Sequence, residues 1–220
     1  MGTVNFGIPL AEALHLRDAM GLTAAVEGGT FRGDTARQLS RCFERVYTIE
    51  RSPRMFALAK DRLRGLTNVR TLGGDTRTHL PDILTREDGI LFWLDAHWSG
   101  GHTYGAGDEC PLLAELQLIF AAGKRCAILV DDARLFAAPP PAPHDPAAWP
   151  ALPDIAKLLP DGWDLVIWND VIFLTPPDAH FRGYMQGRIS RQHNADQRGL
   201  GGLLRRAQRR AIALVRKAGE

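Results

Sequence analysis

Acidic residues stand at the ends of five apolar runs in this chain of 220 residues. They are Glu27, Glu50, Asp75, Asp95 and the pair formed by Asp131 and Asp132. One acidic residue after such a run is usually a solvated turn residue. Acidic residues after all five runs indicate instead that they share a functional role. If the runs are parallel strands, these carboxylates meet at one sheet edge, where open α/β sheets bind ligands. The pattern predicts a site for a ligand rich in hydroxyls, amines or positive charge.

The segment around the first acidic residue has the clearest local pattern. A short apolar run at 24–27 leads into Gly28 and Gly29, and Gly33 follows just before a helix is expected. Glycines let a backbone approach a ligand where a Cβ would collide. The turn lacks the G-x-G-x-x-G pattern of nicotinamide enzymes, which counts against a dehydrogenase. It therefore predicts a ligand-binding turn of another kind.

Strand-like and helix-like segments alternate from about residue 24 to 160. Runs of apolar and β-branched residues predict strands at 24–27, 45–49, 68–72, 90–94 and 126–130. Ser52 with Pro53 predicts a helix start, apolar spacing predicts a helix over 111–122, and a short helix is expected after Pro81. Runs that are apolar throughout indicate strands covered on both faces. The alternation predicts a doubly wound α/β fold with a mostly parallel sheet.

Two further segments interrupt the alternation. Residues 164–168 and 171–175 predict a terminal antiparallel β-hairpin around a tight turn. The proline-rich stretch 137–150 is either a stiff surface connection or a lid over the substrate, with Trp149 as an apolar wall.

Length and composition fit a chain that buries a full core, since 45% of its residues are hydrophobic. We expect a helical N-terminal cover over 1–21, a ligand-binding domain over 22–176 and a basic tail over 177–220. The cover, with a helix over 10–20, is expected either to lie over the site or to form a dimer contact. The second alternative implies a homo-oligomer. Few cysteines, no spanning apolar stretch and no signal sequence favour free thiols and a cytoplasmic protein.

The tail differs in charge from the rest of the chain. Residues 182–220 hold nine Arg and one Lys against one Asp and one Glu, a net charge of +8 in a chain of net charge +2. An apolar stripe over 204–215 predicts a basic amphipathic helix. It either docks on the acidic body or solubilises the chain; contact with a membrane surface or a partner subunit is the alternative. No nucleic acid is expected, because no aromatic residues interleave with the charges.

The pattern Glu27-x-Gly29-x-x-x-Gly33, followed by Glu50 and the terminal hairpin, resembles class I S-adenosylmethionine-dependent methyltransferases over roughly residues 22–176. This resemblance implies a Rossmann-like methyltransferase fold with a seven-stranded sheet and S-adenosyl-L-methionine as cofactor. It implies cofactor contacts from Glu27, Gly28, Gly29, Thr30, Gly33, Glu50, Arg51, Asp75, Thr76 and Asp95. Glu50 would accept hydrogen bonds from both ribose hydroxyls, whereas Asp75 and Thr76 would lie near the adenine.

Residues 94–98 (LDAHW) and 129–132 (LVDD) resemble the metal-ligand segments of magnesium-dependent O-methyltransferases of the catechol and macrolide-sugar types. The resemblance implies that Asp95, Asp131 and Asp132 bind one Mg²⁺. Three carboxylates at one edge also repel one another, and a hard cation with oxygen ligands relieves that repulsion. Alternatively, these residues only cap helices. The chain departs from the catechol pattern, because no lysine closely follows Asp95.

The connection over 98–109 is glycine-rich, aromatic and polar, which is typical of a binding loop on a rigid sheet. His97 and His102 are the histidines nearest the predicted chemistry, and either is expected to accept a proton near neutral pH. Asp108 and Glu109 precede Pro111 and are expected to be helix-start residues, with a substrate contact as the alternative.

Together these features predict an S-adenosylmethionine-dependent methyltransferase that methylates a hydroxyl of a small molecule with the help of a divalent metal. Sugars, polyphenols and natural products all present suitable hydroxyls. Two alternatives stay open. One is a metal-independent N- or carboxyl-methyltransferase, and the other is a non-catalytic cofactor-binding module with a basic recruiting tail.

Overall fold

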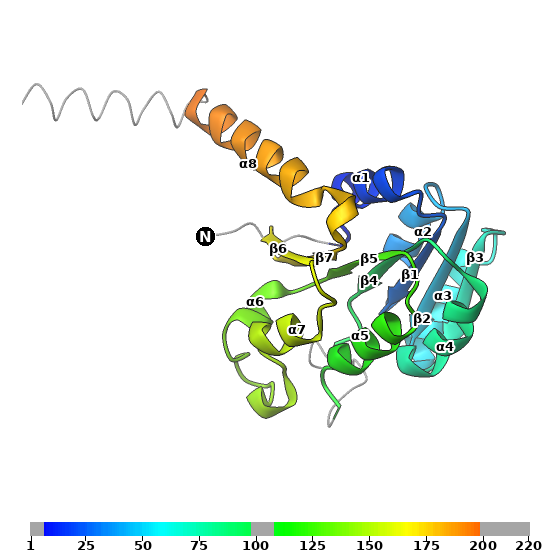
Figure 1. Ribbon diagram of the computed structural model, residues 1–220. Coiled ribbons are helices and arrows are strands. Elements are labelled where there is room, and N and C mark those ends of the chain that lie inside the picture. The colour runs from blue at the N-terminus through cyan, green and yellow to red at the C-terminus, as the bar shows by residue number, and fades with distance from the viewer. Residues whose placement is uncertain (1–6, 98–107, 199–220) are drawn as a thin grey trace, which may run out of the picture. The chain divides into compact units, whose positions relative to one another are not determined.

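The computed structural model describes residues 7–97 and 108–198. The chain divides into two units, residues 1–179 and 180–220. The first, which we call the sheet unit, holds the β-sheet and its flanking helices (Figure 1). The second holds the helix α8 (Phe181–Arg198). The apolar stripe predicted over 204–215 lies outside the described residues.

The described strands form one seven-stranded sheet with the order β3-β2-β1-β4-β5-β7-β6. The strands are β1 (Ala24–Gly28), β2 (Arg45–Glu50), β3 (Val69–Gly73), β4 (Ile90–Leu94), β5 (Cys126–Val130), β6 (Asp164–Trp168) and β7 (Val171–Thr175). The strands β1 to β5 pair in parallel, and β7 runs antiparallel to both of its neighbours. The predicted mostly parallel sheet with a terminal hairpin is confirmed, and the carboxyl ends of five strands share one edge.

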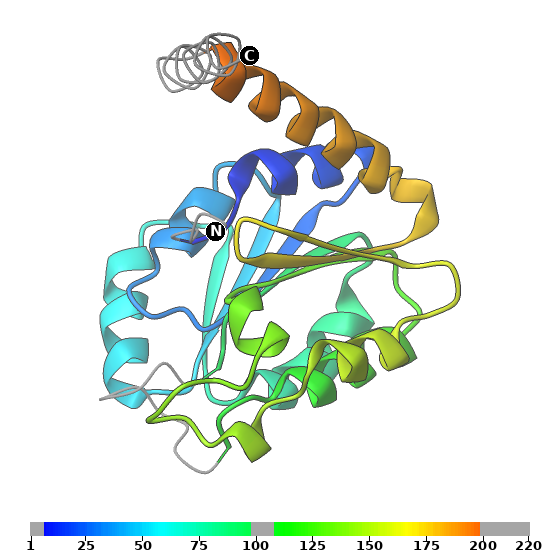
Figure 2. The same ribbon diagram turned by 90° about the vertical axis from the view of Figure 1, so that its left-hand side faces the viewer.

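Helices cover both faces of this sheet. They are α1 (Leu10–Met20), α2 (Asp34–Leu39), α3 (Pro53–Leu63), α4 (Thr76–Arg86), α5 (Leu112–Ala121), α6 (Ala133–Ala137) and α7 (Leu152–Leu158), with short 3₁₀ turns η1 (Pro146–Ala148) and η2 (Pro177–Ala179). The helices α4, α5 and α7 pack side by side on one face, and α1, α2 and α3 lie on the other (Figures 1 and 2). The central strands are therefore buried on both sides, as their apolar runs predict.

Two helix starts bear directly on the site. Ser52 caps α3, where its Oγ accepts a hydrogen bond from Met55 N at 3.5 Å. The helix expected after Pro81 begins instead at Thr76, because the Asp75 carboxylate accepts a hydrogen bond from Arg77 N at 2.9 Å and caps it. Pro81 lies inside this helix. The predicted start after Pro81 is wrong, because the capping carboxylate of Asp75 starts the helix earlier in the chain.

The hairpin turn at Asn169 and Asp170 has positive φ at both residues, 46° and 65°, which matches the twist of a two-residue β-hairpin. All three cysteines are free; Cys126 is buried, and Cys42 and Cys110 are half-buried. Among the described helices, none combines the length and the apolar character that crossing a membrane requires.

Candidate functional site

The glycine turn after β1 touches the end of β4. Gly29 has φ +88°, and a Cβ there would lie 2.3 Å from the carbonyl oxygen of Asp95. A Cβ on Gly28 would lie 3.1 Å from Thr76 Oγ1 and 3.3 Å from Ala96 Cβ. The ends of β1 and β4 and the start of α4 thus meet at this turn. The approach is so close that Gly28 and Gly29 leave little or no room for a Cβ.

Glu27 lies beneath this turn and is only 1% exposed. Its carboxylate accepts a hydrogen bond from Thr48 Oγ1 at 2.5 Å, and Thr30 Oγ1 lies 2.5 Å from the same hydroxyl. Burial raises the pKa of Glu27 to about 8. Glu27 therefore carries a proton at neutral pH and supports the turn from below.

Glu50, at the end of β2, faces the same turn. Its Oε2 accepts a hydrogen bond from Phe31 N at 2.8 Å, and its Oε1 accepts one from Ser52 N at 2.8 Å. A carboxylate has about four acceptor positions, so each oxygen can accept a further hydrogen bond. The carboxylate is half-buried and is positioned by the main chain, which suits it to hold a ligand diol.

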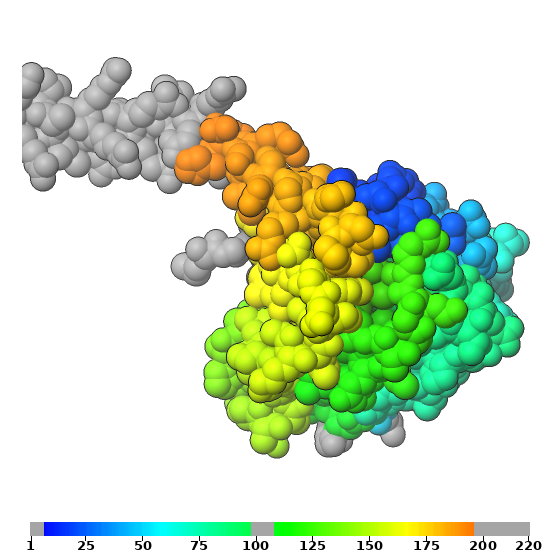
Figure 3. Space-filling view, in the orientation of Figure 1, coloured from blue at the N-terminus to red at the C-terminus, as the bar shows by residue number. Residues whose placement is uncertain are grey.

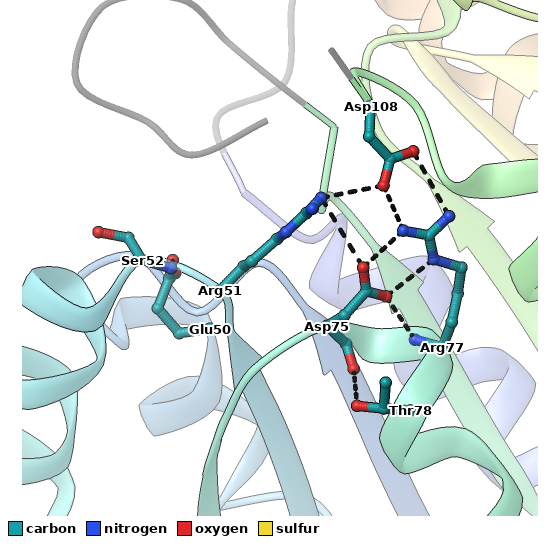
Figure 4. A network of polar contacts seen from close by, with 7 residues as sticks. All are labelled: Glu50, Arg51, Ser52, Asp75, Arg77, Thr78 and Asp108. Carbon is teal, nitrogen blue, oxygen red and sulfur yellow. Dashed lines mark hydrogen bonds and ion pairs between the residues drawn. The ribbon is translucent and has the colours of Figure 1, made fainter. Parts of the chain in front are cut away.

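The carboxyl end of β3 carries a network of ion pairs (Figure 4). Arg77 donates to Asp75 from Nε at 2.9 Å and from a terminal nitrogen at 2.6 Å, and it also pairs with Asp108. Arg51 bonds Asp108 at 3.1 Å and lies 3.7 Å from Asp75. Arg77 lowers the pKa of Asp75 by hydrogen bonding. Both oxygens of Asp75 are therefore engaged by Arg77, a residue that sequence reasoning did not single out.

At the ends of β4 and β5, His97 lies between two of the predicted metal ligands. His97 Nε2 is 2.8 Å from Asp132 Oδ2 and 3.7 Å from Asp95 Oδ1. Burial raises the pKa of Asp95 to about 6, and burial together with Asp95 raises the pKa of Asp131 to about 7. Burial alone would raise the pKa of Asp132 too, but His97 and Arg134 lower it to about 2. Burial opposes the imidazolium, yet the bond to Asp132 raises the pKa of His97.

This arrangement does not fit the predicted magnesium ligand set. Asp132 has φ +55°, and Arg134 holds its Oδ1 at 2.6 Å while His97 holds its Oδ2. Among residues 7–97 and 108–198, His, Cys, Asp and Glu side chains form no group of three that could hold a metal ion. Asp131 and Asp95 have the donor chemistry that a hard cation prefers. The third predicted ligand, Asp132, is instead committed to His97 and Arg134.

An aromatic wall stands behind His97. The ring centroids of Trp149 and Phe136 lie 5.2 Å and 6.4 Å from that of His97, both edge-on. Glu109 holds this wall, since it accepts hydrogen bonds from Trp149 Nε1 at 2.8 Å and Asp145 N at 3.2 Å. Figure 3 shows the stretch that leads to Trp149 at the surface of the sheet unit.

Asp108 and Glu109 were expected to be helix-start residues, but neither side chain caps α5. The helix begins at Leu112, and both carboxylates have other partners. Only the position of these acids beside the glycine-rich stretch could have signalled a role in the sequence. His102 and the rest of 98–107 lie outside the described residues.

Solved structures with the same fold include two methyltransferases. An O-methyltransferase from Bacillus cereus in complex with SAH (S-adenosylhomocysteine) is 16% identical, with a TM-score of 0.54 over 76% of this chain and 81% of that one. The SAH-bound methyltransferase PaMTH1 from Podospora anserina is 18% identical, with a TM-score of 0.53 over 77% and 79%. No protein-family model and no curated protein matches this chain. The structural similarity establishes the Rossmann-like fold of these methyltransferases.

Replacing Gly29 with Ala should destabilise the sheet unit, because the new Cβ would meet the Asp95 carbonyl at 2.3 Å in a left-handed backbone conformation. We expect a loss of about 1–3 kcal/mol or more in the free energy of unfolding, measured in urea. Gly65→Ala is the matched control, since a Cβ there meets nothing within 4 Å. Equal stabilities of the two variants would contradict the close approach.

Glu27→Gln should remove a pH dependence from stability. The folded pKa of about 8 lies above the unfolded value of 4.5, so Glu27 favours the folded state most below pH 4.5, and that contribution is lost as pH rises to about 8. The stability of the native protein relative to Glu27→Gln should then fall by up to about 1.4 kcal/mol per pH unit in this window. Urea titrations between pH 4.5 and 9 measure the difference, and a flat difference would mean that Glu27 is ionised when folded.

Proposed function

We propose that this protein is an S-adenosylmethionine-dependent methyltransferase that methylates a hydroxyl of a small molecule. The observation that carries the proposal is the Glu50 carboxylate, held by two backbone N–H groups beside the turn at Gly28 and Gly29. A carboxylate so placed suits a ribose diol, and a bare turn suits the chain that extends from the ribose. The neighbours bound to SAH share this fold and support the same ligand.

The cofactor supplies a methyl group already activated on a sulfonium. The protein then has to hold an acceptor oxygen in line with that methyl, and such positioning can lower a barrier by about 7–11 kcal/mol. The glycine turn after β1 lies against the Asp95 backbone, and His97 follows Asp95 by two residues. Acceptor oxygen and cofactor would therefore meet at the ends of β1 and β4, and Trp149 and Phe136 would support His97 from behind.

His97 is our proposed proton acceptor. A histidine whose one ring nitrogen bonds a carboxylate is oriented by that bond and keeps its other nitrogen for a substrate. Asp132 provides such a bond at 2.8 Å, and Arg134 fixes Asp132 in turn. The sugar, polyphenol and natural-product classes remain the proposed acceptors.

A magnesium ion does not fit these side chains as they are arranged, because His97 and Arg134 bind both oxygens of Asp132. That observation favours methylation of the hydroxyl without a metal over the metal-assisted reaction.

Glu50→Gln should bind S-adenosylhomocysteine roughly 10- to 100-fold more weakly, because it loses the charge that strengthens hydrogen bonds from a diol. Isothermal titration calorimetry measures the dissociation constants. Glu44→Gln, which lies just before β2 and has a 67% exposed side chain, is the matched control and should bind like the native protein. If the native protein does not bind S-adenosylhomocysteine but binds a pyridine dinucleotide, the proposed function is refuted.

Methyl transfer should survive a chelator. A library of hydroxylated acceptors, screened with methyl-labelled S-adenosylmethionine, identifies a substrate, and its turnover is then compared in EDTA and in Mg²⁺. We expect rates equal within about twofold, because Asp132 is committed to His97 and Arg134. A rate that falls at least tenfold in EDTA and returns with Mg²⁺ would show that the three aspartates rearrange to bind the ion.

A further inference from the structure

One oxygen of a buried carboxyl group beside the site lacks a hydrogen-bond partner among the described residues. Glu115 lies in α5 and is 1% exposed, and its Oε1 has no partner among the described residues. Leaving a buried polar atom unsatisfied costs about 1–3 kcal/mol. Such an atom in a folded protein calls for a ligand, a water or a strain that explains it.

The Glu115 side chain borders a small cavity at the carboxyl ends of β4 and β5. Ala96, His97, Val130 and Phe136 also line it. The cavity has room for about one water-sized group. A single donor of that size could satisfy Oε1.

This cavity adjoins the glycine turn through two residues. A Cβ on Gly28 would contact both Thr76 Oγ1 and Ala96 Cβ, at 3.1 Å and 3.3 Å. Ala96 lines the cavity, and the Thr76 hydroxyl hydrogen-bonds the Glu115 carboxyl group, which opposes the rise of its pKa. The unsatisfied oxygen therefore lies behind the surface against which we propose that the cofactor binds.

The resemblance to methyltransferases assigns the adenine instead to Asp75. In this chain, however, Asp75 accepts three hydrogen bonds from Arg77, through its backbone N, its Nε and a terminal nitrogen, and it also pairs with Arg51 (Figure 4). A new donor at Asp75 would have to displace a charged guanidinium. Glu115 Oε1 is free to accept without any such exchange.

We propose that Glu115, rather than Asp75, accepts a hydrogen bond from the exocyclic amine of the cofactor's adenine. The inference rests on the proposed function. The amine is about the size of a water molecule and supplies the donor that Oε1 lacks. Hypoxanthine, the base of inosine, carries a carbonyl oxygen where adenine has its exocyclic amine. That oxygen only accepts hydrogen bonds, so it would face Glu115 Oε1 with no hydrogen between them. Glu115 is thus a specificity-determining residue that selects adenine.

The test compares two nucleosides that differ at this one group, S-adenosylhomocysteine and S-inosylhomocysteine. Burial raises the pKa of Glu115 to about 7, so calorimetry at pH 8.5 keeps its carboxylate ionised. The native protein should bind the adenosine compound roughly 10- to 100-fold more tightly than the inosine compound. In Glu115→Gln, whose amide can turn to donate or accept, and in Glu115→Leu, the ratio should fall to within about threefold of unity.

Asp75→Asn is the matched control and should keep the native preference. If Glu115→Leu fails to fold, the nearly isosteric Glu115→Gln still decides the question. Native-like preference in both Glu115 variants, or its loss in Asp75→Asn, would overturn the inference. Native protein that binds both nucleosides equally would also overturn it while leaving the proposed function intact, whereas native protein that binds neither would refute the proposed function itself.

Discussion

The turn after β1 passes so close to the end of β4 that residue 29 has to be glycine. A Cβ there would overlap the Asp95 carbonyl, and the same approach is fixed by a hydrogen bond from Asp95 N to Gly28 O at 3.0 Å. Because the two strand ends meet in this way, the Asp95 backbone lies against the turn, and His97 follows two residues later. The candidate cofactor and acceptor positions are neighbours for this reason.

Acidic residues crowd one edge of the sheet, and the fold relieves their repulsion in different ways. Glu27 is buried and protonated, with a pKa of about 8. Asp75 is neutralised by Arg77 and Arg51, and Asp132 by Arg134 and His97. Ion pairing and burial of the protonated form thus relieve the repulsion at Asp75, Asp132 and Glu27. Glu50 differs from the others because backbone N–H groups hold it and leave acceptor positions open.

The two acids before α5 connect the halves of the site. Asp108 pairs with Arg51 and Arg77 near the end of β3, and the next residue, Glu109, holds Trp149 against His97. Adjacent backbone positions thus join the proposed cofactor side to the proposed acceptor side. Glu109 is buried, and it anchors the wall by accepting hydrogen bonds from the indole of Trp149 and from a backbone N–H.

The sequence alone determined where the strands lie along the chain, that most of them run parallel, that a terminal hairpin follows, and at which edge of the sheet the acids gather. These follow from local rules, because apolar runs bury on both faces and parallel strands end on the same side. The start of α4 was predicted wrongly, because the Asp75 carboxylate caps the helix before Pro81 is reached. Only the tertiary structure decided which charges pair. Asp132 bonds His97 and Arg134, and Glu115 Oε1 is left without a partner among the described residues. Such pairings depend on contacts of a few ångströms between residues far apart in the chain.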